Sequence, residues 1–159
     1  MIENKKILLI CKELDSYPMY FLGNELEKKN NNVHYFFIHH HEIIDKNLTS
    51  KNTYFYFKDR INKNNLHDVR DINEEFLKNR NNINIDSYDL DAIEKKFTSF
   101  RGLNQQIISS QATSTPFHDR FYYPQSTFQE NLYWLILNYH KTENVLKQIK
   151  PDYIFDVDT

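Results

Sequence analysis

Apolar and polar segments alternate along the first forty positions in an order that predicts strand, helix and strand. After its lysine, Lys6–Cys11 is continuously apolar, as expected of a strand buried on both faces of a parallel sheet. Asp15 or Ser16 offers an N-cap for a following helix, and apolar residues then recur at helical spacing. Val33–Ile38 predicts a second strand. This order is typical of the right-handed crossover that begins a Rossmann-like sheet.

The middle of the chain is less regular. Thr53–Phe57 is almost entirely aromatic and predicts a third strand. A polar excursion over about 58–86 follows, in which Ile72–Leu77 forms the best helical turn. We expect a further helix from about Ser87 to Phe100, and a loop over Ser109–Thr115 because that stretch is rich in Ser, Thr and Gln.

The strongest helical signal lies near the C-terminus. Ser126 with Gln129, or Thr127 with Glu130, has the form of a capping box, in which each partner satisfies a free backbone N–H. The apolar stripe that follows consists of Phe128, Leu132, Leu135, Ile136, Tyr139, Leu146 and Ile149. A long helix is therefore predicted, and Pro151 lies where it should end.

Tyr153–Val157 then predicts another buried strand. The order of elements places the chain in the α/β class, as a Rossmann-like three-layer domain with a mostly parallel sheet. A length of 159 residues suits one domain with its own core. We therefore expect residues 1–159 to form a single Rossmann-like domain.

Composition narrows the partners and the compartment. A formal net charge of -2 gives no electrostatic reason to expect a nucleic-acid partner. Cys11 is the only cysteine, which excludes an internal disulfide and fits a reducing compartment. The N-terminal apolar run is too short for a signal peptide, and no stretch approaches the ~20 apolar residues of a spanning helix. We expect a cytoplasmic protein; peripheral membrane association is compatible with the sequence, although no residue argues for it.

Several common catalytic arrangements are not expected. Gly23 and Gly102 are the only glycines, so the chain has neither a Gly-x-Gly-x-x-Gly turn nor a P-loop. A dinucleotide-binding oxidoreductase is therefore not expected. Cys11 lies inside a predicted buried strand, where a nucleophilic thiol is not expected. No spacing supports a Ser–His–Asp triad.

Two short motifs contain residues that bind metals in other proteins. Asp156 and Asp158 resemble the carboxylate pair of a metal-dependent phosphatase or the Asp-x-Asp of a fold A glycosyltransferase. They also suit the polar end of an ordinary strand, which is the interpretation we favour. In the same way, His39 and His41 could bind a metal, but no second cluster supplies a third ligand. We expect no metal site, and these histidines to line a crevice at the carboxyl edge of the sheet.

The stretch FHDRFYYP is the most distinctive candidate binding segment. Its charged triplet, His118, Asp119 and Arg120, is bracketed by aromatic residues. Aromatic faces can pack against the C–H surfaces of a sugar, and planar polar groups can bind its hydroxyls. The alternative is that Asp119 and Arg120 form an ion pair that only holds the loop in place.

Four segments together resemble the N-terminal half of capsule and surface-polysaccharide biosynthesis glycosyltransferases of the two-Rossmann (GT-B) type. They are KKILLICKE, VHYFFIHHHE, HDRFYY and VLKQIKPDYIFDVD. The Asp-Arg-aromatic stretch of that family matches Asp119, Arg120 and Phe121, and its Lys-Pro-Asp before an apolar strand matches Lys150–Asp152. The Gly-rich turn that many members carry after the first strand is missing.

The resemblance implies an acceptor-side domain, with a glycan or lipid-linked saccharide as partner. It implies no cofactor in this domain, because the sugar nucleotide is expected to bind a separate C-terminal domain, without which the chain is inactive. By the same resemblance, the acceptor crevice is lined by Glu13, Asp15, Tyr17, His39, His40, His41, His118, Asp119 and Arg120. No catalytic residue is assigned. A non-catalytic α/β module that binds a ligand or a protein, and a magnesium-dependent phosphatase, remain as alternatives.

Overall fold

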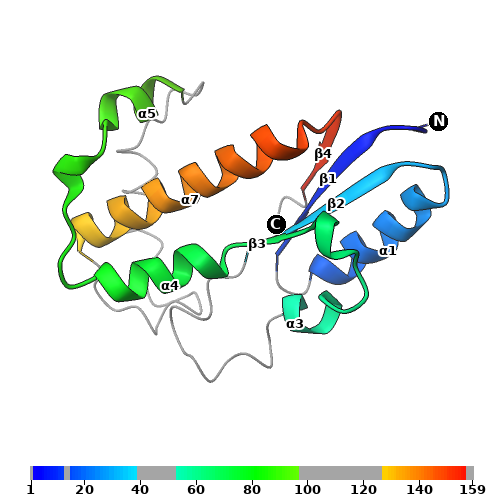
Figure 1. The fold of residues 1–159 in the computed structure, drawn as a ribbon, viewed down its shortest axis with the longest axis horizontal. Coiled ribbons are helices and arrows are strands. Elements are labelled where there is room, and N and C mark those ends of the chain that lie inside the picture. Colours follow the sequence, from blue (N-terminus) through cyan, green and yellow to red (C-terminus); the bar gives the residue numbers. More distant parts are fainter. Residues whose placement is uncertain (1, 13–14, 39–52, 97–126, 157–159) are drawn as a thin grey trace. The chain divides into compact units, whose positions relative to one another are not determined.

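The computed structural model describes residues 2–12, 15–38, 53–96 and 127–156 (Figure 1). The chain divides into two compact units. The first comprises Met1–Glu74 with His140–Thr159, and the second comprises Glu75–Tyr139. That residues 1–159 form a single domain stays a prediction.

The first unit contains a four-stranded sheet whose neighbouring strands are all parallel (Figure 1). Its strands are β1 (Lys6–Cys11), β2 (Asn32–Phe37), β3 (Leu66–Asp68) and β4 (Tyr153–Phe155), in the order β3-β2-β1-β4. In the centre of the sheet, Ile7 of β1 lies opposite Val33 of β2 and Tyr153 of β4. This order and direction confirm the α/β, Rossmann-like fold.

Helices follow the strands in the expected alternation. The α-helices are α1 (Ser16–Glu27), α3 (Thr53–Phe57), α4 (Arg70–Asn79), α5 (Leu90–Lys96) and α7 (Phe128–Ile149). Two short 3-10 turns, η3 (Lys63–Asn65) and η4 (Ile85–Ser87), lie between them. The predicted first helix, the helical turn around residue 74 and the long C-terminal helix are confirmed. The helix predicted for 87–100 is confirmed for 90–96, and the loop predicted for 109–115 lies outside the described residues.

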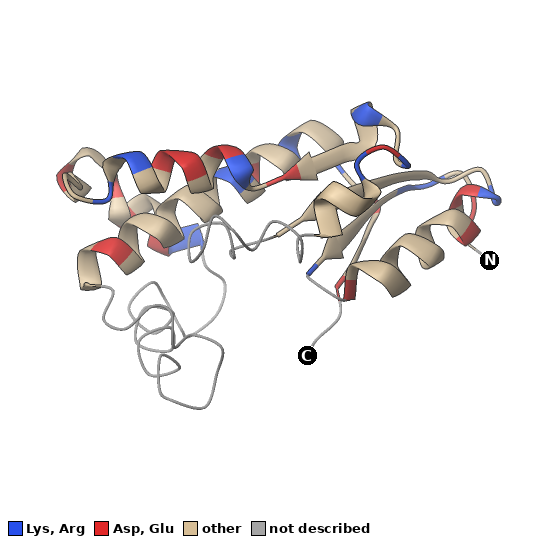
Figure 2. Ribbon diagram, turned by 90° about the horizontal axis from the view of Figure 1, so that it is seen from below, with Lys and Arg blue, Asp and Glu red and all other residues tan. Residues whose placement is uncertain are grey.

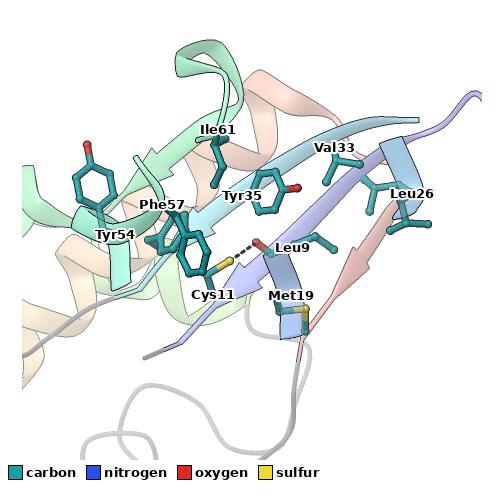
Figure 3. Close-up of a cluster of buried hydrophobic side chains, with 11 residues drawn as sticks. Leu9, Cys11, Met19, Leu26, Val33, Tyr35, Tyr54, Phe57 and Ile61 are labelled. Carbon is teal, nitrogen blue, oxygen red and sulfur yellow. Dashed lines mark hydrogen bonds between the residues drawn. The ribbon is translucent and has the colours of Figure 1, made fainter. Parts of the chain in front are cut away.

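One face of the sheet packs against α1 and α3 through a core of buried side chains (Figure 3). Its members are Ile7, Leu9, Cys11, Met19, Leu26, Val33, Tyr35, Phe37, Tyr54, Phe57 and Ile61. Successive residues of a strand face opposite sides, so the alternate positions Leu8, His34 and Phe36 face away from this core. Leu8 and Phe36 are each only 1% exposed. Figure 2 shows the His140–Ile149 part of α7 on that opposite side of the sheet from α1. β1 and β2 therefore bury apolar side chains on both faces of the sheet, as the continuous apolar pattern of β1 predicts.

The prediction of a strand at Thr53–Phe57 is wrong, because this segment forms helix α3. Helical spacing places Tyr54 and Phe57 together in the core, at 7% and 1% exposure, while Phe55 and Tyr56 point outward. The Thr53 hydroxyl donates to the buried Ser16 hydroxyl at 2.9 Å. Because the run is aromatic at nearly every position, its composition does not distinguish a helical from a strand period.

The third strand of the sheet lies instead within the segment predicted to be a polar excursion. β3 has only three residues, Leu66, His67 and Asp68, and it pairs with β2 through Tyr35, Phe36 and Phe37. All three side chains of β3 are partly exposed. An edge strand this short needs little apolar sequence, which is why its pattern does not predict it.

β4 is a strand, but it is not buried as predicted. Tyr153 is 44% exposed and Ile154 52% exposed. β4 pairs with β1 on one side only, since it lies at the end of the described sheet. Its apolar sequence predicts the strand correctly and its burial incorrectly.

The second unit confirms one of the two predicted capping boxes. Thr127 Oγ1 accepts from the Glu130 backbone N–H at 3.1 Å, and Glu130 Oε2 accepts from the Thr127 N–H at 2.8 Å. Burial alone would raise the pKa of Glu130, but these bonds and the Arg80 guanidinium at 2.8 Å hold it below its usual value. Ile93, Leu132 and Ile136 form the core of this unit, whereas the stripe residue Phe128 is 49% exposed.

Candidate functional site

Charged side chains gather where the parallel strands end, which is the edge at which open α/β sheets bind ligands. Lys12 follows β1 and Asp156 follows β4. The Lys12 Nζ lies 3.0 Å from both carboxylate oxygens of Asp156. Both side chains remain well exposed, at 38% and 48%. β1 and β4 therefore end in an accessible ion pair.

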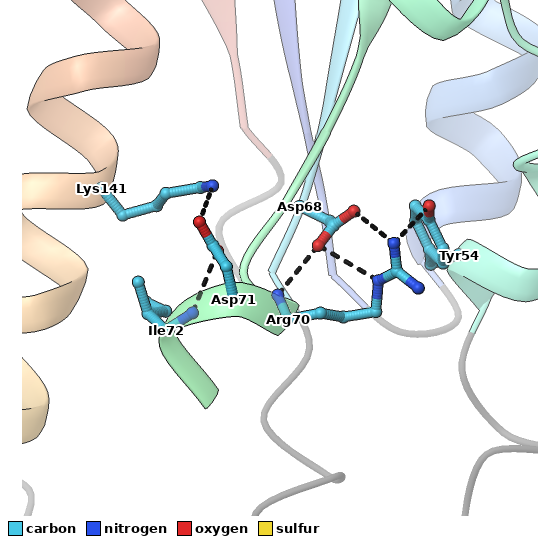
Figure 4. A network of polar contacts seen from close by, with 6 residues as sticks. All are labelled: Tyr54, Asp68, Arg70, Asp71, Ile72 and Lys141. Atoms are coloured by element: carbon cyan, nitrogen blue, oxygen red, sulfur yellow. Dashed lines mark hydrogen bonds and ion pairs between the residues drawn. The ribbon is translucent and has the colours of Figure 1, made fainter. Parts of the chain in front are cut away.

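A second charged pair stands at the end of β3 (Figure 4). The Arg70 guanidinium donates to both Asp68 oxygens, each at 3.2 Å, and to the Tyr54 hydroxyl at 2.6 Å. The Arg70 backbone N–H also donates to Asp68 Oδ1 at 2.8 Å, which fixes the turn from β3 into α4. The two-pronged contact holds the guanidinium plane in one orientation.

The Tyr54 ring packs against the face of the same guanidinium. The Arg70 Cζ lies 4.0 Å from the centre of the Tyr54 ring, within the range of a cation–π contact. Burial raises the pKa of Tyr54, and the neighbouring Asp68 carboxylate raises it further while Arg70 acts in the opposite direction. The phenol therefore stays neutral and can donate or accept a hydrogen bond.

An open cleft of about 560 Å³ adjoins this pair, and we call it the β3 cleft. It is lined by Leu66, His67, Asp68, Arg70, Asp71, Glu74, Lys141, Asn144, Val145 and Gln148. Lys141 of α7 donates to Asp71 of α4 at 2.7 Å (Figure 4). Its volume lies within the range of roughly 300–1,000 Å³ that is usual for small-molecule sites, and its walls are mostly polar.

Two histidines on neighbouring strands meet next to the cleft. His34 Nδ1 of β2 lies 3.2 Å from His67 Nε2 of β3. Burial and then the Lys6 ammonium lower the pKa of His34. Burial, then His34 and Lys141, lower the pKa of His67 to about 4, while Asp68 acts in the opposite direction. Both rings are therefore neutral near pH 7.

A smaller hollow of about 340 Å³ lies on the α1 side of the sheet, at the amino ends of β2 and β3. Its lining includes Tyr20, Glu27, Tyr35 and Arg60. The buried Tyr35 hydroxyl has no hydrogen-bond partner among the described residues. Since this hollow lies at the opposite end of the strands, we assign the functional site to the carboxyl edge instead.

Most of the site residues predicted from sequence lie outside the described part of the chain. These are Glu13, His39, His40, His41, His118, Asp119, Arg120 and Asp158. Asp15 occupies the N-cap position of α1 without a side-chain capping bond. Tyr17 packs its ring on Tyr56 and Phe57, with centroids 5.4 and 5.1 Å away, so the structure gives it a packing role.

The structure adds site residues that sequence reasoning missed, namely Lys12, Asp68, Arg70 and Lys141. Lys12 could have been found, since it directly follows the first predicted strand. The spacing of Asp68 and Arg70 before a helical pattern is a weaker signal, because their strand was not predicted. No local pattern marks Lys141.

Two kinds of feature are absent from the described ranges. No three His, Cys, Asp or Glu side chains there are gathered as metal ligands. None of the helices in those ranges is both long and apolar enough for a membrane span. Basic and acidic residues both occur on α4, α5 and α7 (Figure 2). Compared with known proteins, the chain matches no family model, no curated protein and no solved structure.

Proposed function

We propose that this chain is the acceptor-side N-terminal domain of a GT-B-type glycosyltransferase in bacterial surface or capsular polysaccharide biosynthesis, located in the cytoplasm. The observation that carries the proposal is the carboxyl edge of a Rossmann-like sheet, where Arg70 stands beside the open β3 cleft. Glycosyl transfer is proposed because of the four segments that resemble this family. In this proposal, the saccharide binds at the carboxyl edge of the sheet.

The lining of the β3 cleft suits a ligand rich in hydroxyl groups. A sugar hydroxyl both donates and accepts, and so it can bind a guanidinium and a carboxylate at once. Arg70 and Asp68 present this combination in a fixed plane, and Asn144 and Gln148 add amides on the facing helix. In this proposal, these residues bind and orient the acceptor. The sugar nucleotide binds the C-terminal domain, so the chain alone does not transfer sugar.

A non-catalytic α/β module that binds a ligand or a protein is the second candidate. It is favoured by the way in which charged groups at the edge pair with each other: Lys12 with Asp156, and Asp68 with Arg70. Such pairs can simply close the ends of strands. A binding experiment separates the two candidates.

The test is calorimetric titration of the chain with short oligosaccharides released from bacterial capsules, and separately with UDP-glucose. We expect an oligosaccharide to bind and UDP-glucose not to bind. Arg70→Lys keeps the charge but loses the planar fork, and should weaken oligosaccharide binding about tenfold, or ~1.4 kcal/mol.

Arg60→Lys is a matched control. Arg60 also stacks on a tyrosine, at 4.1 Å from the Tyr56 ring, and donates to its hydroxyl at 3.0 Å, but it lies away from the β3 cleft. It should leave binding unchanged. Equal affinities for Arg70→Lys and the unmodified chain, or binding of peptides in place of all glycans, would contradict the proposal.

A further inference from the structure

Two imidazoles are held together on a rigid part of the sheet. His34 lies within β2 and His67 within β3, and these strands pair in parallel. The Nδ1 atom of His34 and the Nε2 atom of His67 are 3.2 Å apart, with ring centroids at 5.4 Å. Each backbone is fixed by strand pairing, so the two nitrogens are positioned before any ligand binds.

This separation matches that of two ligands on one metal ion. Imidazole nitrogens bind zinc at ~2.0–2.1 Å, and a tetrahedral ion with such bonds places neighbouring nitrogens about 3.3 Å apart. The nitrogens of His34 and His67 therefore need to move very little. Once the donor ring carries its proton on the remote nitrogen instead, a small rotation of each ring directs both lone pairs toward a shared ion.

The protonation state of the pair also suits a metal. Metal binding requires neutral imidazole, which is the main form of an ordinary histidine side chain at pH 7. Without a metal, the N–H of one ring donates a hydrogen bond to the unprotonated nitrogen of the other. When an ion binds, each ring keeps its single proton on the remote nitrogen, so no net proton release is needed.

The position of His67 gives an ion access from solvent. His67 lines the open β3 cleft, where water can complete the coordination. Asp71 is paired with Lys141 at 2.7 Å. Because no three ligands are gathered in the described ranges, the protein supplies two. The nearby Lys6 and Lys141 ammonium groups oppose a cation and keep the site weak.

We propose that His34 and His67 form a two-histidine site for a divalent first-row transition metal, with water filling the other positions. Cu²⁺ binds more strongly than Ni²⁺ or Zn²⁺ at such nitrogen sites, and the exchangeable ion sits beside the β3 cleft. This site does not depend on the chain being a glycosyltransferase.

The test uses the full chain without an affinity tag, in a background that removes the competing histidine run by His39→Asn, His40→Asn and His41→Asn. Calorimetry at neutral pH with Cu²⁺ alone should show one bound equivalent. His34→Asn and His67→Asn should each weaken it by at least about tenfold, since each removes one of two protein ligands. His140→Asn, an exposed histidine outside the pair, should leave it unchanged.

Paramagnetic Cu²⁺ provides a measurement that needs no substitution of His34 or His67. Substoichiometric Cu²⁺ should broaden the amide signals of His34 and His67 first in the NMR spectrum of the background protein. Broadening centred elsewhere, or equal Cu²⁺ affinity after either substitution in the pair, would overturn the proposal. Loss of Cu²⁺ binding leaves the saccharide test at Arg70 unaffected, so the two proposals fail separately.

Discussion

Gly23→Ala is expected to lower the free energy of unfolding by about 3 kcal/mol, as overpacking of a fixed core does. A Cβ at position 23 would stand 2.0 Å from the Tyr35 hydroxyl oxygen and 2.6 Å from its Cζ. Tyr35 is only 1% exposed and cannot swing into solvent without leaving the core. Urea denaturation followed by circular dichroism measures the change.

The second half of this test is a double-mutant cycle with Tyr35→Leu. A leucine lacks the ring atoms that the new methyl group meets, so Gly23→Ala should be neutral or stabilising in that background. The stabilisation is at most ~1 kcal/mol, because alanine is the better helix former. Such a reversal of sign assigns the cost to this one contact. If alanine destabilises both backgrounds equally, the close approach of α1 to β2 is wrong.

Cys11 is expected to resist alkylation until the first unit unfolds. Its side chain is fully buried in β1, and its S–H points to the Leu9 carbonyl oxygen at 3.8 Å (Figure 3). Burial raises the pKa of this thiol from 9.0 to about 12. At pH 8 the thiolate fraction falls roughly a thousandfold, and the thiolate is the reactive form. Iodoacetamide labelling followed by mass spectrometry measures the rate.

Lys63→Cys in a Cys11→Ala background supplies an exposed thiol for comparison, and it should react at the rate of a free cysteine. Gly23→Ala should speed the labelling of Cys11 about a hundredfold if labelling follows global unfolding, as ~3 kcal/mol requires. Native Cys11 reacting as rapidly as the exposed thiol would show that β1 is not buried as described.

The parts of the fold that sequence predicts best are those with local signals. β1 is a continuous apolar run, and its observed bounds match the prediction. The box formed by Thr127 and Glu130 is likewise local, since both partners lie within one turn. The signals for these two features lie among neighbouring residues, so they can be recognised without knowledge of the tertiary contacts.

The predictions that failed depend on distant contacts. The segment predicted as the third strand forms helix α3, because Tyr54 and Phe57 fill the core beside α1. The third strand, β3, lies in the predicted polar excursion instead, because Leu66–Asp68 pairs with β2. An aromatic run fits the periodicity of a helix and that of a strand equally well. A three-residue strand is too short to show a pattern of its own. Tertiary packing decides both cases.

The place of the candidate site can be predicted, but its partners cannot. Lys12 and Asp156 follow two predicted strands, and parallel strands end at one edge. Their pairing joins residues 144 positions apart, and it depends on β1 and β4 being neighbours in the sheet. The pairing of Arg70 with Asp68 and Tyr54 could not be inferred while β3 and α3 were assigned wrongly.

The most direct measurement of the central claim is a map of amide chemical shifts as capsule oligosaccharide is added to the isotopically labelled chain. Binding at the carboxyl edge should shift the amides of Lys12, Val69, Arg70 and Asp156. The amides at the opposite ends of the strands, such as Lys5 and Asn31, should stay unchanged. Shifts confined to those opposite ends, or no shifts at any oligosaccharide concentration, would contradict the account.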